Sequence, residues 1–96
     1  MAAYVIVDMT VKDTVKIEEY RRLAGASIAA HGGKFLIRGG GIEILDGDWS
    51  PQRVVLIEFP GMEQARRWRS SADYEKAREI RDRAATTRMI LVEGAA

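Results

Sequence analysis

The chain contains no cysteine, which excludes disulfide bonds, a thiolate nucleophile and cysteine-ligated zinc or iron–sulfur clusters. It contains one histidine, His31, and a lone histidine without cysteine argues against a dedicated transition-metal site. No apolar run approaches the roughly 20 residues that a membrane-spanning helix requires. These absences narrow the chemistry without naming a reaction.

Charge of either sign is also not in excess. Fifteen basic and fourteen acidic residues give a net charge of +1, whereas a nucleic-acid-binding protein usually carries a marked basic surplus. The first residues lack a basic region and reach Asp8 quickly, so we expect no signal peptide, no membrane attachment and a cytoplasmic location. The length predicts one domain spanning residues 1–96, and a domain this small favours a stabilising partner subunit.

The apolar pattern predicts strands and helices in the order β-α-β-β-α-β. The predicted strands cover residues 4–11, 34–38 with a continuation at 42–45, 52–59 and 88–93. The first predicted helix begins at Asp13 or Thr14 and ends at Gly32-Gly33. A second, short helix begins at Met62, and a further helical segment begins near Ala72. This order is typical of the α+β, ferredoxin-like split βαβ fold, with an antiparallel sheet in strand order 4-1-3-2.

The predicted strands are apolar on both faces. In the first strand Val5 and Val7 point one way, and Tyr4 and Ile6 point the other. Strands of this kind need cover on both sides, and the helices supply only one cover. We therefore predict a homodimer in which two sheets face each other.

Several segments resemble a bacterial family known as domain of unknown function 1330. The resemblance rests on Gly-Gly-Lys-Phe-Leu-Ile-Arg-Gly-Gly at 32–40, Pro-Gln-Arg-Val-Val-Leu-Ile-Glu-Phe-Pro at 51–60, residues 65–70 and 71–74, Arg81, and residues 92–94. It covers nearly the whole chain and implies a dimeric α+β barrel. That superfamily includes cofactor-free monooxygenases, small-ring isomerases, haem enzymes and stress-response proteins, but the family itself has no established reaction. The chain departs from the family pattern at Gly61, Arg69 and Ala72.

Three charged residues lie inside otherwise apolar strands: Asp8, Arg38 and Glu58. Asp8 and Glu58 are predicted on the face opposite the helices, with Arg38 on a neighbouring strand. One interpretation is a cross-strand ion pair between Arg38 and Glu58 that fixes register or dimer geometry. The other is a ligand pocket with Arg38 as carboxylate anchor and Glu58 as general base.

His31 and the aromatic pair Trp68 and Tyr74 each have two interpretations. His31 is either a helix-end residue favoured by the helix dipole or a group that transfers a proton or ligates haem. Trp68 and Tyr74 either pack on the sheet or line a cleft for a small organic ligand between the second helix and the sheet. Trp49 is predicted to cover the partner subunit.

Seven arginines between residues 66 and 88 alternate with acidic residues and predict a solvated, ion-paired helix surface. Arg81 is the exception, because it lies near the inward stripe and would need an anionic partner from the protein or a ligand. Gly39-Gly40-Gly41 lacks the phosphate-loop and dinucleotide-binding spacings and predicts a β-bulge.

Three functional hypotheses follow. The first is an enzyme without a tightly bound cofactor that acts on a small anionic organic acid or cyclic metabolite. In it, Arg38 or Arg81 holds the anion, Glu58 or His31 moves a proton, and Trp68 with Tyr74 forms an apolar wall. The second is a non-catalytic small-molecule-binding or accessory protein. The third is haem or metal binding through His31.

Overall fold

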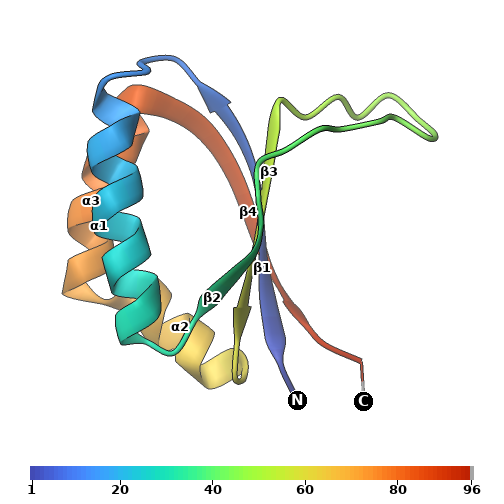
Figure 1. Cartoon of the computed structure of the whole chain (residues 1–96). Helices are drawn as coiled ribbons and strands as arrows, with labels where there is room; N and C mark the ends of the chain where they lie inside the picture. Colours follow the sequence, from blue (N-terminus) through green and yellow to red (C-terminus); the bar gives the residue numbers. More distant parts are fainter. Residues whose placement is uncertain (96) are drawn as a thin grey trace.

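The computed structural model describes residues 1–95 and shows one antiparallel sheet with all helices on the same face (Figure 1). The strands are β1 (Ala3–Val11), β2 (Lys34–Arg38), β3 (Arg53–Phe59) and β4 (Ala85–Glu93). The helices are α1 (Lys16–Ala30), α2 (Met62–Ser70) and α3 (Ala72–Ala84). The sheet order is β2-β3-β1-β4, which is the predicted 4-1-3-2 order seen from the other edge. The predicted ferredoxin-like fold is confirmed.

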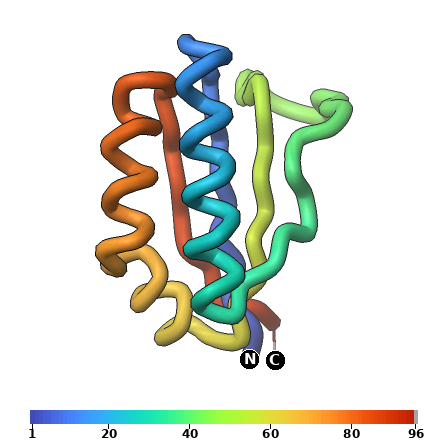
Figure 2. Tube along the Cα trace, turned by 60° about the vertical axis from the view of Figure 1, so that its left-hand side comes forward, coloured from blue at the N-terminus to red at the C-terminus, as the bar shows by residue number. Residues whose placement is uncertain are grey.

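The core lies between the sheet and the helix layer. The odd-numbered residues from Ala3 to Met9 in β1 and from Val55 to Phe59 in β3 are buried, because successive strand residues alternate between faces. From the helices, Ile17, Trp68 and Tyr74 meet this surface and are almost fully inaccessible to solvent. Each fully buried large apolar side chain contributes about 1.5–3 kcal/mol. Figure 2 shows α1 and α3 side by side over the sheet.

Helix α1 begins and ends where the sequence predicts. The Asp13 carboxylate accepts the backbone N–H groups of Val15 and Lys16 at 3.0 and 2.9 Å, and these bonds lower the pKa of Asp13. At the other end Gly32 has a φ of 78°, and its N–H reaches the carbonyl of Ala29. The N–H of Gly33 reaches the carbonyl of Ile28, which completes a Schellman-type end.

Two predicted strand boundaries are wrong. Residues 42–45 form no strand, because the chain leaves the sheet after Arg38 in an irregular loop. Gly39, Gly40 and Gly47 in this loop have φ values of 80°, 112° and 81°, which are incompatible with continued strand geometry. Figure 1 shows the loop projecting away from the helices. Strand β4 begins at Ala85 rather than at residue 88, since the chain passes from α3 into extended backbone without a connecting loop.

The irregularity predicted at the glycines lies instead inside β2. Phe35 pairs with Ile57 and Ile37 pairs with Leu56, so Leu36 is an extra residue without a partner in β3. Such a bulge reverses the direction of every later side chain in the strand. Arg38 therefore lies opposite Val55, on the helix face of the sheet.

The face of the sheet away from the helices, hereafter the open face, has no cover in the monomer. Ile37, Ile90 and Val92 on this face are 43%, 59% and 41% exposed. Among them lies a polar cluster in which Glu58 accepts the Tyr4 hydroxyl at 3.1 Å and the Lys34 ammonium at 3.2 Å. Within residues 1–95, none of the helices has the length and apolar character to cross a membrane.

The hydrogen bonds from Lys34 and Tyr4 lower the pKa of Glu58 below its ordinary value of 4.5. A lowered pKa in the folded state means that Glu58 stabilises the fold above that value and that this contribution is lost as the pH falls through the folded pKa. We expect Glu58→Gln to lower the melting temperature at pH 7, with the difference from wild type shrinking as the pH falls below 4.5 and Glu58 takes up a proton.

The control is Glu43→Gln, because Glu43 is exposed in the loop and has no ion pair within residues 1–95. Thermal unfolding of the three proteins from pH 7 to pH 2 measures the effect. A Glu58→Gln difference that is constant across this range would contradict the assignment.

Candidate functional site

A cleft of about 490 Å³ lies between the helix layer and the β1–β4 side of the sheet. Its walls are mostly apolar, and four lining residues carry polar or charged groups. The apolar lining residues are Val5, Ala65, Trp68, Met89, Ile90 and Leu91, and the polar ones are Arg66, Arg69, Ser70 and Glu75. This volume and this mixture of surfaces are typical of small-molecule sites.

The break between α2 and α3 shapes the cleft. Ser71 has extended backbone dihedrals, so α2 ends there and α3 begins in a new direction. The Ser71 hydroxyl donates to the carbonyl of Trp68 at 2.7 Å and accepts the N–H of Tyr74 at 3.2 Å. One serine therefore ends the first helix and caps the second, and it orients the residues on both sides of the break.

The inner wall of the cleft is aromatic. The Trp68 ring lies 5.3 Å from the Phe59 ring and 4.3 Å from the Tyr74 ring, measured between centroids. The Trp68 indole N–H donates to the Ser27 hydroxyl at 3.1 Å, so its polar edge is satisfied away from the cleft. The sequence left open whether Trp68 packs in the core or lines a cleft, and in the structure it does both.

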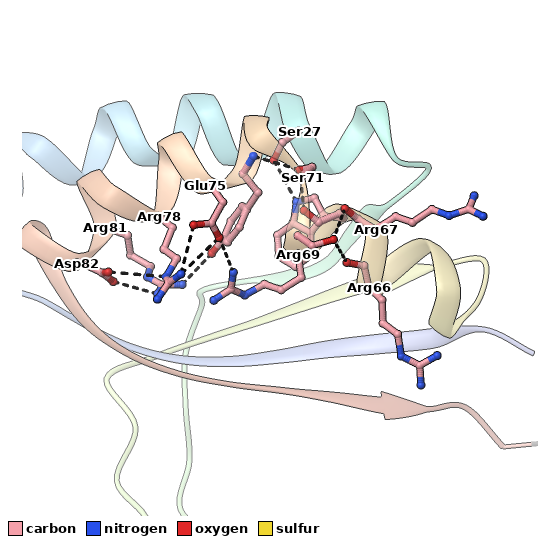
Figure 3. A network of polar contacts seen from close by, with 12 residues as sticks. Ser27, Arg66, Arg67, Arg69, Ser71, Glu75, Arg78, Arg81 and Asp82 are labelled. Carbon is pink, nitrogen blue, oxygen red and sulfur yellow. Dashed lines mark hydrogen bonds and ion pairs between the residues drawn. The ribbon is translucent and has the colours of Figure 1, made fainter.

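The rim of the cleft is rich in arginine (Figure 3). Arg69 pairs with Glu75 at 3.2 Å, and Glu75 also pairs with Arg78 at 3.3 Å. Arg66 lines the cleft and has no ion-pair partner within residues 1–95. Figure 3 shows Arg66 and Arg69 on the sheet side of α2, with Arg67 directed away. An apolar cleft with an unpaired arginine at its rim suits an anionic ligand with an apolar body.

Tyr74 and Arg81 belong to a buried network behind the cleft and do not line it. An Arg81 Nη1 donates to the Tyr74 hydroxyl at 2.8 Å, and Tyr74 and Tyr20 share a hydrogen bond of 3.0 Å. The Arg81 Nη2 pairs with the Asp82 carboxylate at 3.0 Å. The anionic partner predicted for Arg81 is therefore present within the protein.

The network shifts the acidity of its members. Burial, followed by the charge and hydrogen bond of Tyr74, raises the pKa of Tyr20. Burial by itself lowers the pKa of Arg81, but the combined effects of Tyr74, Asp82 and Tyr20 outweigh it and the net shift is upward. Tyr20 therefore stays neutral and Arg81 stays charged at physiological pH.

The predicted pairing of Arg38 with Glu58 is wrong. The bulge at Leu36 places Arg38 on the helix face, where its guanidinium lies 4.2 Å from the Phe35 ring centroid, while Glu58 lies on the open face. Lys34 takes the position beside Glu58. Asp8, also on the open face, accepts the Trp49 indole N–H at 3.0 Å and an Arg88 N–H at 3.1 Å.

His31 lies at the C-terminal end of α1 and does not line the cleft. Its Nδ1 is 2.8 Å from the carbonyl oxygen of Ser27, and a carbonyl can only accept, so Nδ1 carries a proton. Within residues 1–95 no three histidine or carboxylate side chains gather in a way that could hold a metal ion.

Sequence reasoning missed Arg66, Glu75 and Ser70 as lining residues. Arg66 and Arg69 stand three apart beside the buried pair Ala65 and Trp68, and this spacing is the signal that could have placed both on the edge of the cleft.

Several solved structures share this fold. A protein of unknown function from Rhodopseudomonas palustris, RPA0582, is 18% identical with a TM-score of 0.81, and the match covers 99% of this chain and 83% of that one. SnoaB, a cofactor-independent oxygenase from Streptomyces nogalater, is 12% identical with a TM-score of 0.66 over 99% and 94% of the chains. A dimeric ferredoxin-like protein of unknown function from Thermobifida fusca is 16% identical with a TM-score of 0.62 over 100% and 92%.

No curated protein matches the chain. The model of one protein family, the domain of unknown function DUF1330, matches residues 2–95. The resemblance seen in the sequence is thereby confirmed, and the chain belongs to the DUF1330 family.

Proposed function

We propose that the protein binds a small cyclic organic acid in the cleft between the helix layer and the β1–β4 side of the sheet, and acts on it without a tightly bound cofactor. The observation that carries this proposal is the combination of an apolar cleft of about 490 Å³ with an unpaired arginine, Arg66, at its rim. A ring would lie against Trp68, Met89 and Leu91, and its carboxylate or acidic hydroxyl would meet Arg66 and Arg69.

Catalysis would use the charges at the rim. Glu75 is the one carboxylate among the lining residues, so it is the group that can accept a proton from a ring hydroxyl or an acidic C–H. Arg66 and Arg69 would stabilise the substrate anion left behind. Such an anion can pass one electron to dioxygen, and the substrate radical and superoxide then combine to form a peroxide at the substrate carbon. The peroxide takes up the proton held by Glu75, its O–O bond breaks with loss of water, and a carbonyl is left at that carbon without a cofactor. SnoaB has the same fold and is a cofactor-independent oxygenase, which supports this route.

The anion site predicts a difference between two neighbouring arginines. Arg66→Gln should raise the dissociation constant of benzoate about tenfold, since charge-assisted hydrogen bonds are the strong ones. Arg67→Gln is the matched control, because Arg67 is paired with Glu63 at 2.7 Å and does not line the cleft. Fluorescence of Trp68 in a Trp49→Phe background reports binding, with benzamide as the uncharged analogue. Equal effects of the two substitutions, or equal binding of benzamide, would reject the site.

A measurement of substrate turnover distinguishes the proposed enzyme from a non-catalytic binding protein. Glu75→Gln should keep ligand binding but lose oxygen consumption with a panel of polycyclic phenols, at least about 100-fold, as for removal of a general base. Glu79→Gln, an exposed change on the same helix, should keep full activity. Oxygen uptake under air against argon gives the measurement. Saturable binding with no consumption of any phenol by the wild type would favour the alternative, a non-catalytic binding or accessory protein.

We also propose that the open face forms a homodimer. Its apolar side chains and those of the adjoining loop are too exposed for a monomer surface of this size to leave uncovered. They are Leu36, Ile37, Ile90 and Val92 on the sheet, and Ile42, Ile44, Leu45 and Trp49 in the loop. The dimeric Thermobifida fusca protein, which shares the fold, supports this assembly.

A charge placed on this surface should separate the subunits. Val92→Glu is expected to shift the protein from dimer to monomer in sedimentation velocity, because a buried unpaired carboxylate costs several kcal/mol. Ala26→Glu adds the same charge to an exposed position on α1 and should leave the dimer intact. A wild-type monomer at micromolar concentration would overturn the proposed assembly.

A further inference from the structure

Three arginines surround a second, smaller hollow on the opposite edge of the helix layer. It lies between α1 and strands β2 and β3, has a volume of about 40 Å³, and is lined at its rim by Arg21, Arg38 and Arg53. We call it the arginine hollow. The cleft described above lies toward β4, at the other end of the sheet order, so the two sites share none of their rim residues.

The positive charge in the arginine hollow is only partly balanced by the protein. Arg38 and Arg53 have no carboxylate partner within residues 1–95, and Arg21 pairs with the exposed Glu18. Burial, then the charges of Arg21 and Arg38, lower the pKa of Arg53, and the charge of Glu18 opposes this shift without cancelling it. Three guanidinium groups therefore face one carboxylate, and the excess positive charge works against the stability of the fold.

Two of the guanidinium groups are also held in place. Arg53 donates to the backbone carbonyl of Arg38 at 3.2 Å, and its guanidinium lies against the backbone of Gly39, where a side chain would collide with it. Arg38 stacks on the Phe35 ring, and its Nη2 lies 3.8 Å from the place that a Cβ on Gly25 would occupy. A Cβ at Gly25 would make only an ordinary contact with Arg38, so glycine is needed for the close approach at Gly39 alone. A pre-positioned guanidinium loses less entropy when it binds.

The floor of the arginine hollow is apolar. Ala24, Phe35, Val55 and Ile57 line it beneath the guanidinium groups. A liquid water molecule takes about 30 Å³, so a space of about 40 Å³ suits a short alkyl group such as methyl or ethyl. Guanidinium forks match the two oxygens of a carboxylate.

From the unbalanced charge, the fixed guanidinium groups and the small apolar floor, we propose that the arginine hollow is a binding site for a short-chain carboxylate. The carboxylate lies between Arg38 and Arg53, with Arg21 contributing charge, and the short alkyl group enters the floor. This site does not depend on the function proposed for the cleft. The bulge at Leu36 creates it, because that extra residue turns Arg38 to the helix face.

The experiment uses propionate and the full-length protein at constant ionic strength, with chloride replaced by propionate. We expect saturable shifts of the Gly25 and Gly39 amide resonances, with a dissociation constant on the order of 1–10 mM for so small a ligand. Arg38→Gln and Arg53→Gln should each raise this constant at least about tenfold. Arg38→Lys and Arg53→Lys, which keep the charge but lose the fork, test the same contacts if either glutamine variant fails to fold.

Two controls separate a built site from general attraction. Arg22→Gln removes the same charge from an exposed position next to Arg21, and Arg66→Gln removes it from the cleft; both should leave propionate affinity within about twofold. Propionamide should not bind. The proposal is overturned by the absence of saturable shifts, by an equal loss in Arg22→Gln, or by inorganic phosphate binding as tightly as propionate. Loss of propionate binding in Arg66→Gln alone would instead place the ligand in the cleft.

Discussion

The hydrogen bond from the Trp68 indole to the Ser27 hydroxyl is the interaction on which the helix layer depends. It joins the end of α2 to the last turn of α1 in the buried core, and Ser27 in turn donates to the carbonyl of Ala24 at 2.8 Å. Both polar groups are therefore satisfied without water. Loss of one partner would leave the other buried and unpaired, at a cost of about 1–3 kcal/mol. Because Trp68 is also the inner wall of the cleft, the same bond fixes the shape of the candidate site.

The helix layer leaves an opening at each edge of the sheet, and the two openings have a common construction. Each has an apolar floor made by the strands and a rim that carries arginines. Arginine suits this position, since its alkyl stem packs on apolar surface while its guanidinium stays charged in contact with water. The volumes differ by more than tenfold, about 490 Å³ against about 40 Å³, so the ligands proposed for the two openings differ in size but share an anionic head group.

The strand order and the core were predictable because the apolar alternation of β1 and β3 is regular and the turn residues are distinct. The position of Arg38 was not predictable. In the run Phe35-Leu36-Ile37 any residue could be the extra one in a bulge, and a shift by one residue reverses the side chain at Arg38. The resulting error paired Arg38 with Glu58 and left the arginine hollow unrecognised.

The residues at the rim of the cleft, such as Arg69 and Glu75, were not predicted to line a site, for a different reason. Glu75 does form ion pairs, with Arg69 and Arg78, on the helix surface that was predicted to be solvated and ion-paired. The sequence pattern alone cannot show that this surface overlooks a cleft in the same molecule. That depends on the angle between α2 and α3, which the break at Ser71 sets in three dimensions. For Arg81 the inward position was predictable, and its burial agrees with it.

The direct passage from α3 into β4 has a mechanical consequence. The carbonyl of Ala84 accepts the N–H groups of both Lys12 and Asp13, at 2.7 and 3.0 Å, so the end of α3, the start of β4 and the turn after β1 are fastened at one point. Figure 1 shows α3 and β4 diverging from this junction, with no loop between them. A substitution that displaces Ala84 would therefore be transmitted to the helix layer and to β4 together, and so to both walls of the cleft at once.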